Sequence, residues 1–271
     1  MYMGRSVAMK VGFVQFNPVF GEVDANIAKT LSLIEKIDKA DLLVLPELFN
    51  TGYLIVSQGE IDALAEEIPH GKTTQALSTA ARERSCFIVA GIAEREGDRI
   101  YNSAVLVGPQ GYMGTYRKIH LFFEEKRWFS PGDRGFGVYD IGPCRLGIMI
   151  CFDWIFPESM RTLSLKGAHI ICHPANLVLP FCQDAMRTRC LENRVYAITA
   201  NRTGLEERNG KSLYYTGKSQ VMGPDADLIV RSEEDVEETQ VVEIDIARSE
   251  KKSLNEYNDL FKDRRPEFYK N

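Results

Sequence analysis

The sequence predicts one large α/β domain built on a mixed β-sheet, for three reasons. The 271 residues are 44% hydrophobic, which is enough to bury a substantial core in a single domain. Apolar segments of strand length alternate with segments of helical periodicity, without a long linker between them. Glycine-containing turns join some neighbouring apolar segments as hairpins, so the sheet contains antiparallel as well as parallel pairs.

The first half of the chain is expected to hold two helices and five strands. Residues 24–39 place Ile27, Leu31, Ile34 and Ile37 at the spacing of one helix face, and residues 73–84 form the second helix. Strands are predicted at 10–16, 42–45 and 86–93. Residues 103–107 and 113–117 form a hairpin across Gly108-Pro-Gln-Gly111.

The second half continues the same alternation. Residues 138–141 and 145–150 are predicted to pair across Gly142-Pro143, and Pro157 is a favourable first residue for a helix over 157–166. A second helix is expected at 184–193. Further strands are predicted at 170–173, 196–201, 219–222, 228–231 and 240–244. The charged and aromatic segment after Ile246 is expected to pack on a partner or on the domain edge.

Composition excludes several classes of protein. A net charge of −5, without a basic cluster, argues against a nucleic-acid surface. Residues 1–8 have no continuous apolar region of the signal-peptide type, and are predicted to be a flexible extension before a single domain at 9–271. No apolar run reaches membrane-spanning length. The six cysteines form no C-x-x-C pair, so we predict a cytoplasmic protein without a metal site or cofactor.

Three reactive side chains follow predicted strands. Cys151 ends an apolar segment before a short aromatic turn, where a thiol can be held rigidly and still face a cleft. Glu47 closes the apolar run at 42–45, and Lys118 leaves an alternating strand for an apolar loop. Each has an ordinary structural explanation: a buried thiol, a helix cap or surface ion pair, and a solvated strand end. Their shared position at strand ends favours a reactive site.

The segments around these residues resemble the signatures of the nitrilase superfamily, the carbon–nitrogen hydrolases with a Glu-Lys-Cys triad. The matching segments are Pro46-Glu47-Leu-Phe-Asn-Thr-Gly52-Tyr53, Tyr116-Arg-Lys118-Ile-His120-Leu-Phe and Gly147-Ile-Met-Ile-Cys151-Phe-Asp153-Trp-Ile-Phe-Pro157-Glu158. Two later segments, at 167–176 and 189–196, also fit, so the likeness covers nearly the whole chain.

The resemblance implies a fold and an assembly. The superfamily fold is a four-layer α-β-β-α sandwich. Members commonly dimerise into an eight-layer α-β-β-α-α-β-β-α stack. By analogy, the helices at 157–166 and 184–193 supply the interface of a homodimer, to which the C-terminal segment contributes.

The resemblance also implies roles for the site residues. Cys151 forms a thioester with the substrate, Glu47 acts as base and acid, and Lys118 with the backbone N–H of Phe152 stabilises the oxyanion. Glu125 is predicted to hold Lys118, in preference to Glu124, by its spacing before Pro131-Gly132. The remaining residues expected around the substrate are Tyr53, Phe152, Trp154 and Asn176. Two of the nearby polar residues have structural alternatives: Asp153 as a helix N-cap, and Asn176 as a turn residue.

A Cys-His hydrolase is the rival enzyme class. The four histidines are His70, His120, His169 and His173, of which His120 and His173 lie near predicted site segments. We expect His120 to make a structural hydrogen bond in the Lys118 loop and His173 to be a satisfied core group. A histidine base would titrate near pH 6 to 7, as an approximate range.

The predicted reaction is hydrolysis of a small aliphatic primary amide to a carboxylate and ammonia. Phe152-Asp153-Trp154 is more similar to amidase-like branches than to nitrilases. Hydrolysis of an aliphatic nitrile is the second candidate and of an N-carbamoyl amine the third; a non-enzymatic scaffold is the alternative outside catalysis. The expected pocket is compact, mostly apolar and lined by aromatic residues: Phe49, Tyr53, Phe122, Phe123, Trp128, Phe152 and Trp154.

Overall fold

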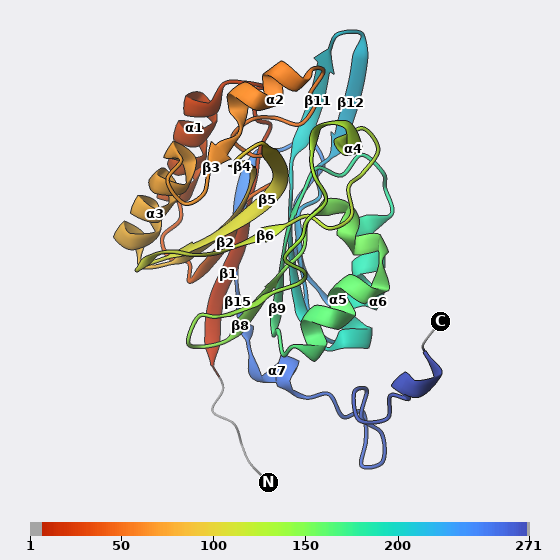
Figure 1. The fold of residues 1–271 in the computed structure, drawn as a ribbon. Helices are drawn as coiled ribbons and strands as arrows, with labels where there is room; N and C mark the ends of the chain where they lie inside the picture. The colour runs from red at the N-terminus through yellow and green to blue at the C-terminus, as the bar shows by residue number, and fades with distance from the viewer. Residues whose placement is uncertain (1–6, 270–271) are drawn as a thin grey trace.

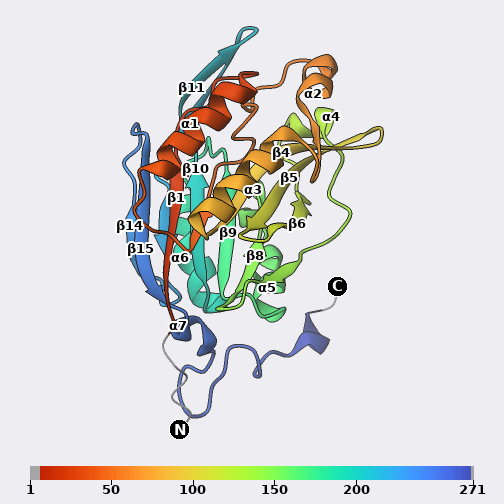
Figure 2. The same ribbon diagram turned by 90° about the vertical axis from the view of Figure 1, so that its left-hand side faces the viewer.

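Two mixed β-sheets face each other and carry helices on their outer sides (Figure 1). The structure is a computed structural model and describes residues 7–269. The layers are therefore α-β-β-α, as the resemblance implied. The helical pair α1 (Val23–Glu35) and α3 (Lys72–Arg84) covers one sheet, which Figure 2 views from the helical side. The pair α5 (Pro157–Leu165) and α6 (Cys182–Asn193) covers the other.

The first sheet has the order β15-β1-β2-β4-β5-β6, with β3 pairing beside β4. Its strands are β1 (Ala8–Gln15), β2 (Leu42–Val44), β3 (Glu66–Glu67), β4 (Phe87–Glu96), β5 (Arg99–Gly108), β6 (Gly111–Arg117) and β15 (Glu238–Asp245). Strands β1, β2 and β4 are parallel, and β5 and β6 follow as antiparallel neighbours. Two reversals bring β6 back to the direction of β2, so both strands end at the same edge.

The second sheet has the order β14-β13-β10-β9-β8-β7. Its strands are β7 (Val138–Asp140), β8 (Arg145–Ile148), β9 (Ile170–Ala175), β10 (Tyr196–Asn201), β13 (Gln220–Met222) and β14 (Leu228–Arg231). The parallel strands β8, β9 and β10 lie at its centre, and every residue of β9 and β10 is buried. Their apolar sequences fit strands that are covered on both faces.

The hydrophobic core fills the space between the two sheets. Phe13 and Val44 of the first sheet belong to the same buried cluster as Ile148, Ile171 and Ile198 of the second. A separate cluster, which includes Phe16, Ile34 and Leu77, joins the first sheet to α1 and α3. Burial of apolar side chains on both faces of the first sheet therefore holds three of the four layers together.

Several short elements complete the fold. These are α2 (Gln58–Leu64), α4 (Glu125–Trp128), α7 (Ala247–Glu250), the 3₁₀ turns η1 (Cys151–Ile155) and η2 (Pro266–Phe268), and a separate hairpin of β11 (Thr203–Arg208) and β12 (Lys211–Thr216). In the described residues, no helix combines the length and the apolar character needed to cross a lipid bilayer.

The sequence missed the β11–β12 hairpin, although its turn carries a strong local signal. Asn209 and Gly210 both adopt positive φ, 49° and 72°, as a two-residue turn between antiparallel strands requires. The flanking strands are rich in charge, with Glu206, Glu207 and Lys211, and so lack the apolar pattern on which strand prediction depends. The Asn-Gly turn is therefore a better predictor of this hairpin than the apolar pattern of its strands.

Two predicted boundaries were wrong near the N-terminus. Ala8 was assigned to the flexible extension but already pairs with Asp245 in β1, while residues 1–6 of that extension lie outside the described residues. The predicted helix at 24–39 ends at Glu35, because the chain must turn back to place β2 beside β1. The carbonyl of Ile37 accepts a hydrogen bond from Arg84 in that turn.

The loop after β2 is fixed against β4 at Gly91. The Gly91 N–H donates to Pro46 O at 3.1 Å, and the Gly91 carbonyl accepts from Phe49 N at 3.0 Å. A side chain at this position would collide with the Cα of Glu47. Glycine is therefore required for the close approach that positions Glu47.

We predict that Gly91→Ala lowers the free energy of unfolding by about 1–3 kcal/mol, because the added methyl group forces the Glu47 loop away from β4. Denaturant unfolding measures the change. Gly59→Ala is the matched control, since Gly59 lies in α2 and a methyl group added there meets no atom within 4 Å. Equal stability of the two variants would contradict the packing argument.

Candidate active site

Glu47 is a fully buried carboxylate just beyond β2. Its Oε1 accepts hydrogen bonds from Lys118 Nζ and Asn102 Nδ2, both at 2.7 Å. Its Oε2 is buried without a hydrogen-bond partner among the described residues. Burying a carboxylate oxygen without a hydrogen bond costs folding free energy, which suggests a functional use for it. Because Oε2 has no donor bound to it in the described part of the chain, it is available to accept a proton.

Lys118 is the first residue after β6 and its side chain is also fully buried. Its backbone is held on both sides: the N–H donates to Asn102 O at 2.8 Å, and the carbonyl accepts from Gly132 N at 2.8 Å. The Nζ donates to Glu47 and to Glu125, each at 2.7 Å. The edge shared by β2 and β6 thus brings together residues 71 positions apart.

Glu125 begins α4 and receives three hydrogen bonds. Its Oε1 accepts from Lys118 Nζ at 2.7 Å and from Tyr53 Oη at 2.6 Å, and its Oε2 accepts from Phe122 N at 3.0 Å. Glu125, not Glu124, is therefore the carboxylate that contacts Lys118. Tyr53, expected near the substrate, reaches this carboxylate directly.

Cys151 starts the turn η1, three residues beyond the end of β8. Its φ of 41° lies in the left-handed region, which is unusual for a residue with a side chain. Such strain is a feature of nucleophiles held at a sharp strand-to-helix turn. Cys151 lines a cavity of about 150 Å³ together with Phe152, Trp154 and Asn176, three of the residues expected around the substrate.

Asn176 connects the two sheets at this edge. It follows β9, and its Nδ2 donates to the backbone carbonyl of Glu47 at 2.8 Å. Because β8 and β9 are parallel, the residues after them, Cys151 and Asn176, lie at one edge of the second sheet. That edge faces the edge of the first sheet that carries Glu47 and Lys118.

The charges of the site act on one another. Burial alone would lower the pKa of Lys118, but the adjacent Glu125 and Glu47 outweigh it and raise the pKa above its ordinary value. The ammonium therefore stays protonated. Burial and the charge of Glu47 raise the pKa of the Cys151 thiol well above its ordinary value, although Lys118 opposes them. The resting thiol thus keeps its proton and needs a base.

The contacts of His173 argue against the rival Cys-His mechanism. His173 Nε2 lies 3.0 Å from the carbonyl oxygen of Cys151, which can act as an acceptor but not as a donor, so this nitrogen carries the proton. His173 Nδ1 lies 3.1 Å from Thr199 Oγ1 and must accept from it. Burial lowers the pKa of His173 to about 4. Both ring nitrogens are occupied, and His173 holds the backbone of Cys151.

Asp153 is not the N-cap that the sequence offered as its structural alternative. Helix α5 is preceded by Phe156, while Asp153 lies inside η1 and is fully buried. Its Oδ2 accepts from Ile150 N at 2.9 Å and Tyr116 Oη at 2.7 Å, and its Oδ1 lies 2.7 Å from His120 Nδ1. Asp153 therefore connects the Cys151 turn to the loop that carries Lys118.

Sequence reasoning missed or misplaced some residues. Asn102, which contacts Glu47, was overlooked, because its contact depends on the register between strands and not on a local sequence pattern. Phe49 was expected in the pocket but is fully buried in the core cluster that joins the first sheet to α1 and α3. No group of three or more His, Cys, Asp or Glu side chains within residues 7–269 is arranged to hold a metal ion.

The comparisons with known proteins agree on the family. The model of the carbon–nitrogen hydrolase family matches residues 10–252. The chain is 51% identical to a protein named Nitrilase from Pyrococcus abyssi, over 96% of this chain and 99% of that one. It is 34% identical to an (R)-stereoselective amidase from a Pseudomonas species, over 95% and 92% of the two chains. A crystal structure of a carbon–nitrogen hydrolase from Helicobacter pylori G27 has a TM-score of 0.88 and 27% identity, with 97% of each chain covered.

The fold and the family match thus define a hydrolase that acts on carbon–nitrogen bonds. The chain belongs to the carbon–nitrogen hydrolase family, within the nitrilase superfamily.

The acid side of the pH–rate profile tests the role of Glu125. Burial raises the pKa of Glu125 to about 7, despite the opposing charge of Lys118. Glu125 accepts all three hydrogen bonds, an arrangement that favours the ionised carboxylate. We therefore predict that kcat/KM falls as the pH decreases through about 7, where Glu125 takes up a proton.

The variants Glu125→Gln and His120→Gln separate this carboxylate from the nearby imidazole. Glu125→Gln should remove the transition near pH 7 together with most of the activity, and His120→Gln should retain the transition. If the transition disappears in His120→Gln and persists in Glu125→Gln, the assignment to Glu125 is wrong.

Proposed function

We propose that the enzyme hydrolyses a small aliphatic primary amide to a carboxylate and ammonia through a thioester on Cys151. The observation that supports this most is the buried ammonium of Lys118, held at 2.7 Å from both Glu47 and Glu125, at the sheet edge that faces the edge carrying Cys151. A buried cation with two carboxylates can stabilise a developing oxyanion and leave one carboxylate free for proton transfer.

In the proposed first step, Glu47 takes the thiol proton of Cys151 through its unpaired Oε2. The sulfur attacks the amide carbon, and the oxygen becomes an oxyanion that Lys118 and the Phe152 N–H stabilise. Protonated Glu47 then gives its proton to the nitrogen as the carbon–nitrogen bond breaks. Ammonia leaves, and the acyl group remains on sulfur as a thioester.

In the second step, Glu47 accepts a proton from water, which attacks the thioester carbon. The carbon–sulfur bond breaks, the carboxylate product leaves, and Cys151 regains its proton. Glu125 keeps Lys118 in position through the contact at 2.7 Å, and together with Tyr53 it orients the amide nitrogen. Phe152, Trp154 and Asn176 border the thiol and contact the substrate.

Nitrile hydrolysis is the second candidate, and a specific observation favours it: the relative with 51% identity is named Nitrilase. The same thiol can add to a nitrile carbon to give a thioimidate, which water converts to the thioester with loss of ammonia. The two reactions thus share the same side chains and differ in the first bond attacked.

A panel of aliphatic amides, nitriles and N-carbamoyl amines, assayed by ammonia release, tests the proposed reaction. We expect primary amides to give the highest kcat/KM. Turnover of nitriles alone would contradict the amide proposal and favour the second candidate.

The same assay tests the catalytic residues. We predict that Cys151→Ala and Glu47→Gln abolish turnover, and that Lys118→Met lowers kcat by about 10²–10³. Iodoacetamide should alkylate the wild-type protein at Cys151 and lose that site in Cys151→Ala. The buried thiol of Cys86, in the core beneath α3, provides the control variant Cys86→Ala. Equal activity of the Cys151 and Cys86 variants would rule out a thioester mechanism.

We also propose that the protein is a homodimer that associates through the α5–α6 face. Exposed apolar side chains on and beside these helices support this: Ile155, Leu165, Leu179, Phe181 and Leu191 are 42–62% exposed. Sedimentation equilibrium should give twice the monomer mass of 30.7 kDa, and Leu191→Lys should shift the protein toward the monomer. A wild-type monomer at micromolar concentration would contradict the proposal.

A further inference from the structure

A second, larger cavity adjoins the one that contains Cys151. It has a volume of about 330 Å³ and an apolar lining that includes Leu54, Ile55, Trp128 and Leu213. Phe122 and Val178 line both cavities. A chain attached to Cys151 in the smaller cavity can therefore extend past these two side chains into the larger one.

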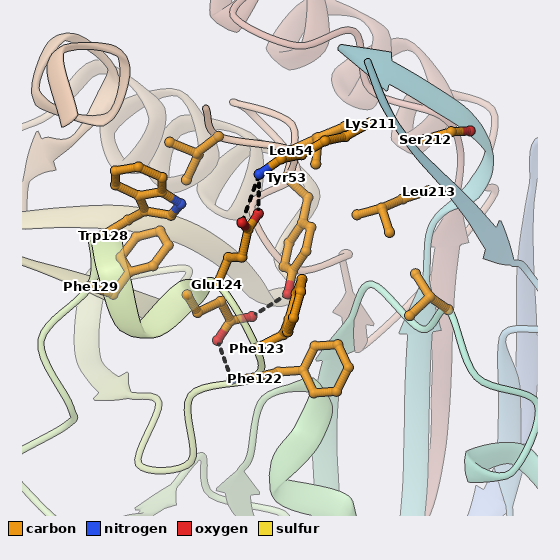
Figure 3. Close-up of a pocket in the computed structure, with 13 residues that line it drawn as sticks. Tyr53, Leu54, Phe122, Phe123, Glu124, Trp128, Phe129, Lys211, Ser212 and Leu213 are labelled. Carbon is orange, nitrogen blue, oxygen red and sulfur yellow. Dashed lines mark hydrogen bonds and ion pairs between the residues drawn. The ribbon is translucent and has the colours of Figure 1, made fainter. Parts of the chain in front are cut away.

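The larger cavity has charged groups in its wall, and each is already paired. Glu125 is bound to Lys118, as described above. The Nζ of Lys211, on β12, lies 2.7 and 2.6 Å from the two carboxylate oxygens of Glu124, which precedes α4 (Figure 3). Arg127 also reaches Glu124, at 3.2 Å, from a largely exposed position.

The Glu124–Lys211 pair is placed where it meets a bound chain. Figure 3 shows the Lys211 ammonium next to the Glu124 carboxylate, beside Tyr53, and both residues of the pair line the cavity. The side chain of Glu124 is 23% exposed and that of Lys211 is 39% exposed. Both oxygens of Glu124 face one ammonium, so this ammonium is satisfied without a ligand.

A charged ligand group is disfavoured in this cavity. A carboxylate that entered it would lose its hydration and would meet two carboxylates, Glu124 and Glu125, whose cations are already engaged. An apolar chain of the same shape loses little on leaving water and gains from contact with the aromatic and aliphatic lining.

We infer that the Glu124–Lys211 ion pair selects the acyl group: the enzyme accepts amides with uncharged, apolar acyl chains and rejects those whose chain ends in a carboxylate. Glu124 occupies the ammonium that would otherwise bind the substrate carboxylate. This inference rests on the proposed amide hydrolysis and adds the class of acyl group and the residues that select it.

Matched substrates test the selection. Isocaproamide and succinamate have the same length and differ in an isopropyl group against a carboxylate; glutaramate and its isopropyl analogue extend the comparison by one methylene. We expect the wild-type enzyme to favour each apolar amide by at least about tenfold in kcat/KM. Glu124→Gln, which frees Lys211, should reduce this preference by about tenfold through better use of the carboxylates.

Two further variants separate the ion pair from other effects. Adding Lys211→Met to Glu124→Gln should restore the wild-type preference, because the Lys211 ammonium is gone. Arg127 is present in both variants, so the difference between them belongs to Lys211. Glu234→Gln is the matched control: it unpairs Lys218, which lies 2.8 Å from Glu234 with side chains 42% and 39% exposed, away from this cavity. The control should leave the preference unchanged.

A binding measurement that needs no turnover distinguishes this inference from the proposed reaction. Isocaproaldehyde and succinic semialdehyde can add reversibly to Cys151, and their protection of the thiol against iodoacetamide is measured by mass spectrometry. Protection by the apolar aldehyde at concentrations at least about tenfold lower supports the inference, even if no amide is hydrolysed and the proposed reaction fails.

Other results overturn the inference while amide turnover is intact. These are equal or better use of the carboxylate substrates by the wild-type enzyme, or a preference that Glu124→Gln does not change. The first of these would mean that Lys211 leaves Glu124 to bind the substrate. Failure of both aldehydes to protect Cys151 also overturns it, since the cavity would then not receive the chain.

Discussion

The site depends on one interaction: the ammonium of Lys118, fully buried and shared by Glu47 and Glu125 at 2.7 Å each. A single buried cation would be unstable without a partner, and two adjacent buried carboxylates would repel each other without the cation. The arrangement leaves one net negative charge beside a protonated thiol. In the proposed mechanism that charge is Glu47, which removes the thiol proton, while the ammonium remains for the oxyanion.

The fold positions this group of charges by strand direction. Two antiparallel reversals after β4 return β6 to the direction of β2, and the parallel pair β8 and β9 gives Cys151 and Asn176 a common edge. The Asn176 side chain then connects the sheets through the Glu47 carbonyl. Gly91 permits the close approach behind Glu47, and Asp153 and His173 hold the Cys151 turn. Most of these groups are polar, buried and hydrogen-bonded, so they fix geometry more than they add stability.

Much of the fold and of the candidate site was predictable from the sequence. The remainder was unpredictable, and the reasons are physical. Glu47 and Cys151 follow apolar strands and Lys118 follows an alternating one, local patterns that the sequence displays directly. Strands β10 and β14 were predicted with their observed bounds. The contact of Asn102 with Glu47 depends on register between strands, which no local pattern encodes. The Glu124–Lys211 pair joins residues 87 positions apart, and Lys211 lies in a hairpin whose charged strands lack the apolar pattern that predicts strands. The Asn209-Gly210 turn was a usable signal for that hairpin.

The most direct test of the mechanism is peptide mapping of enzyme quenched with acid during turnover of a primary amide. The account predicts an acyl group on the peptide that contains Cys151, absent in Cys151→Ala and accumulated when water attack is slowed. An unmodified Cys151 in an enzyme that is turning over, or an acyl group on another residue, would contradict it.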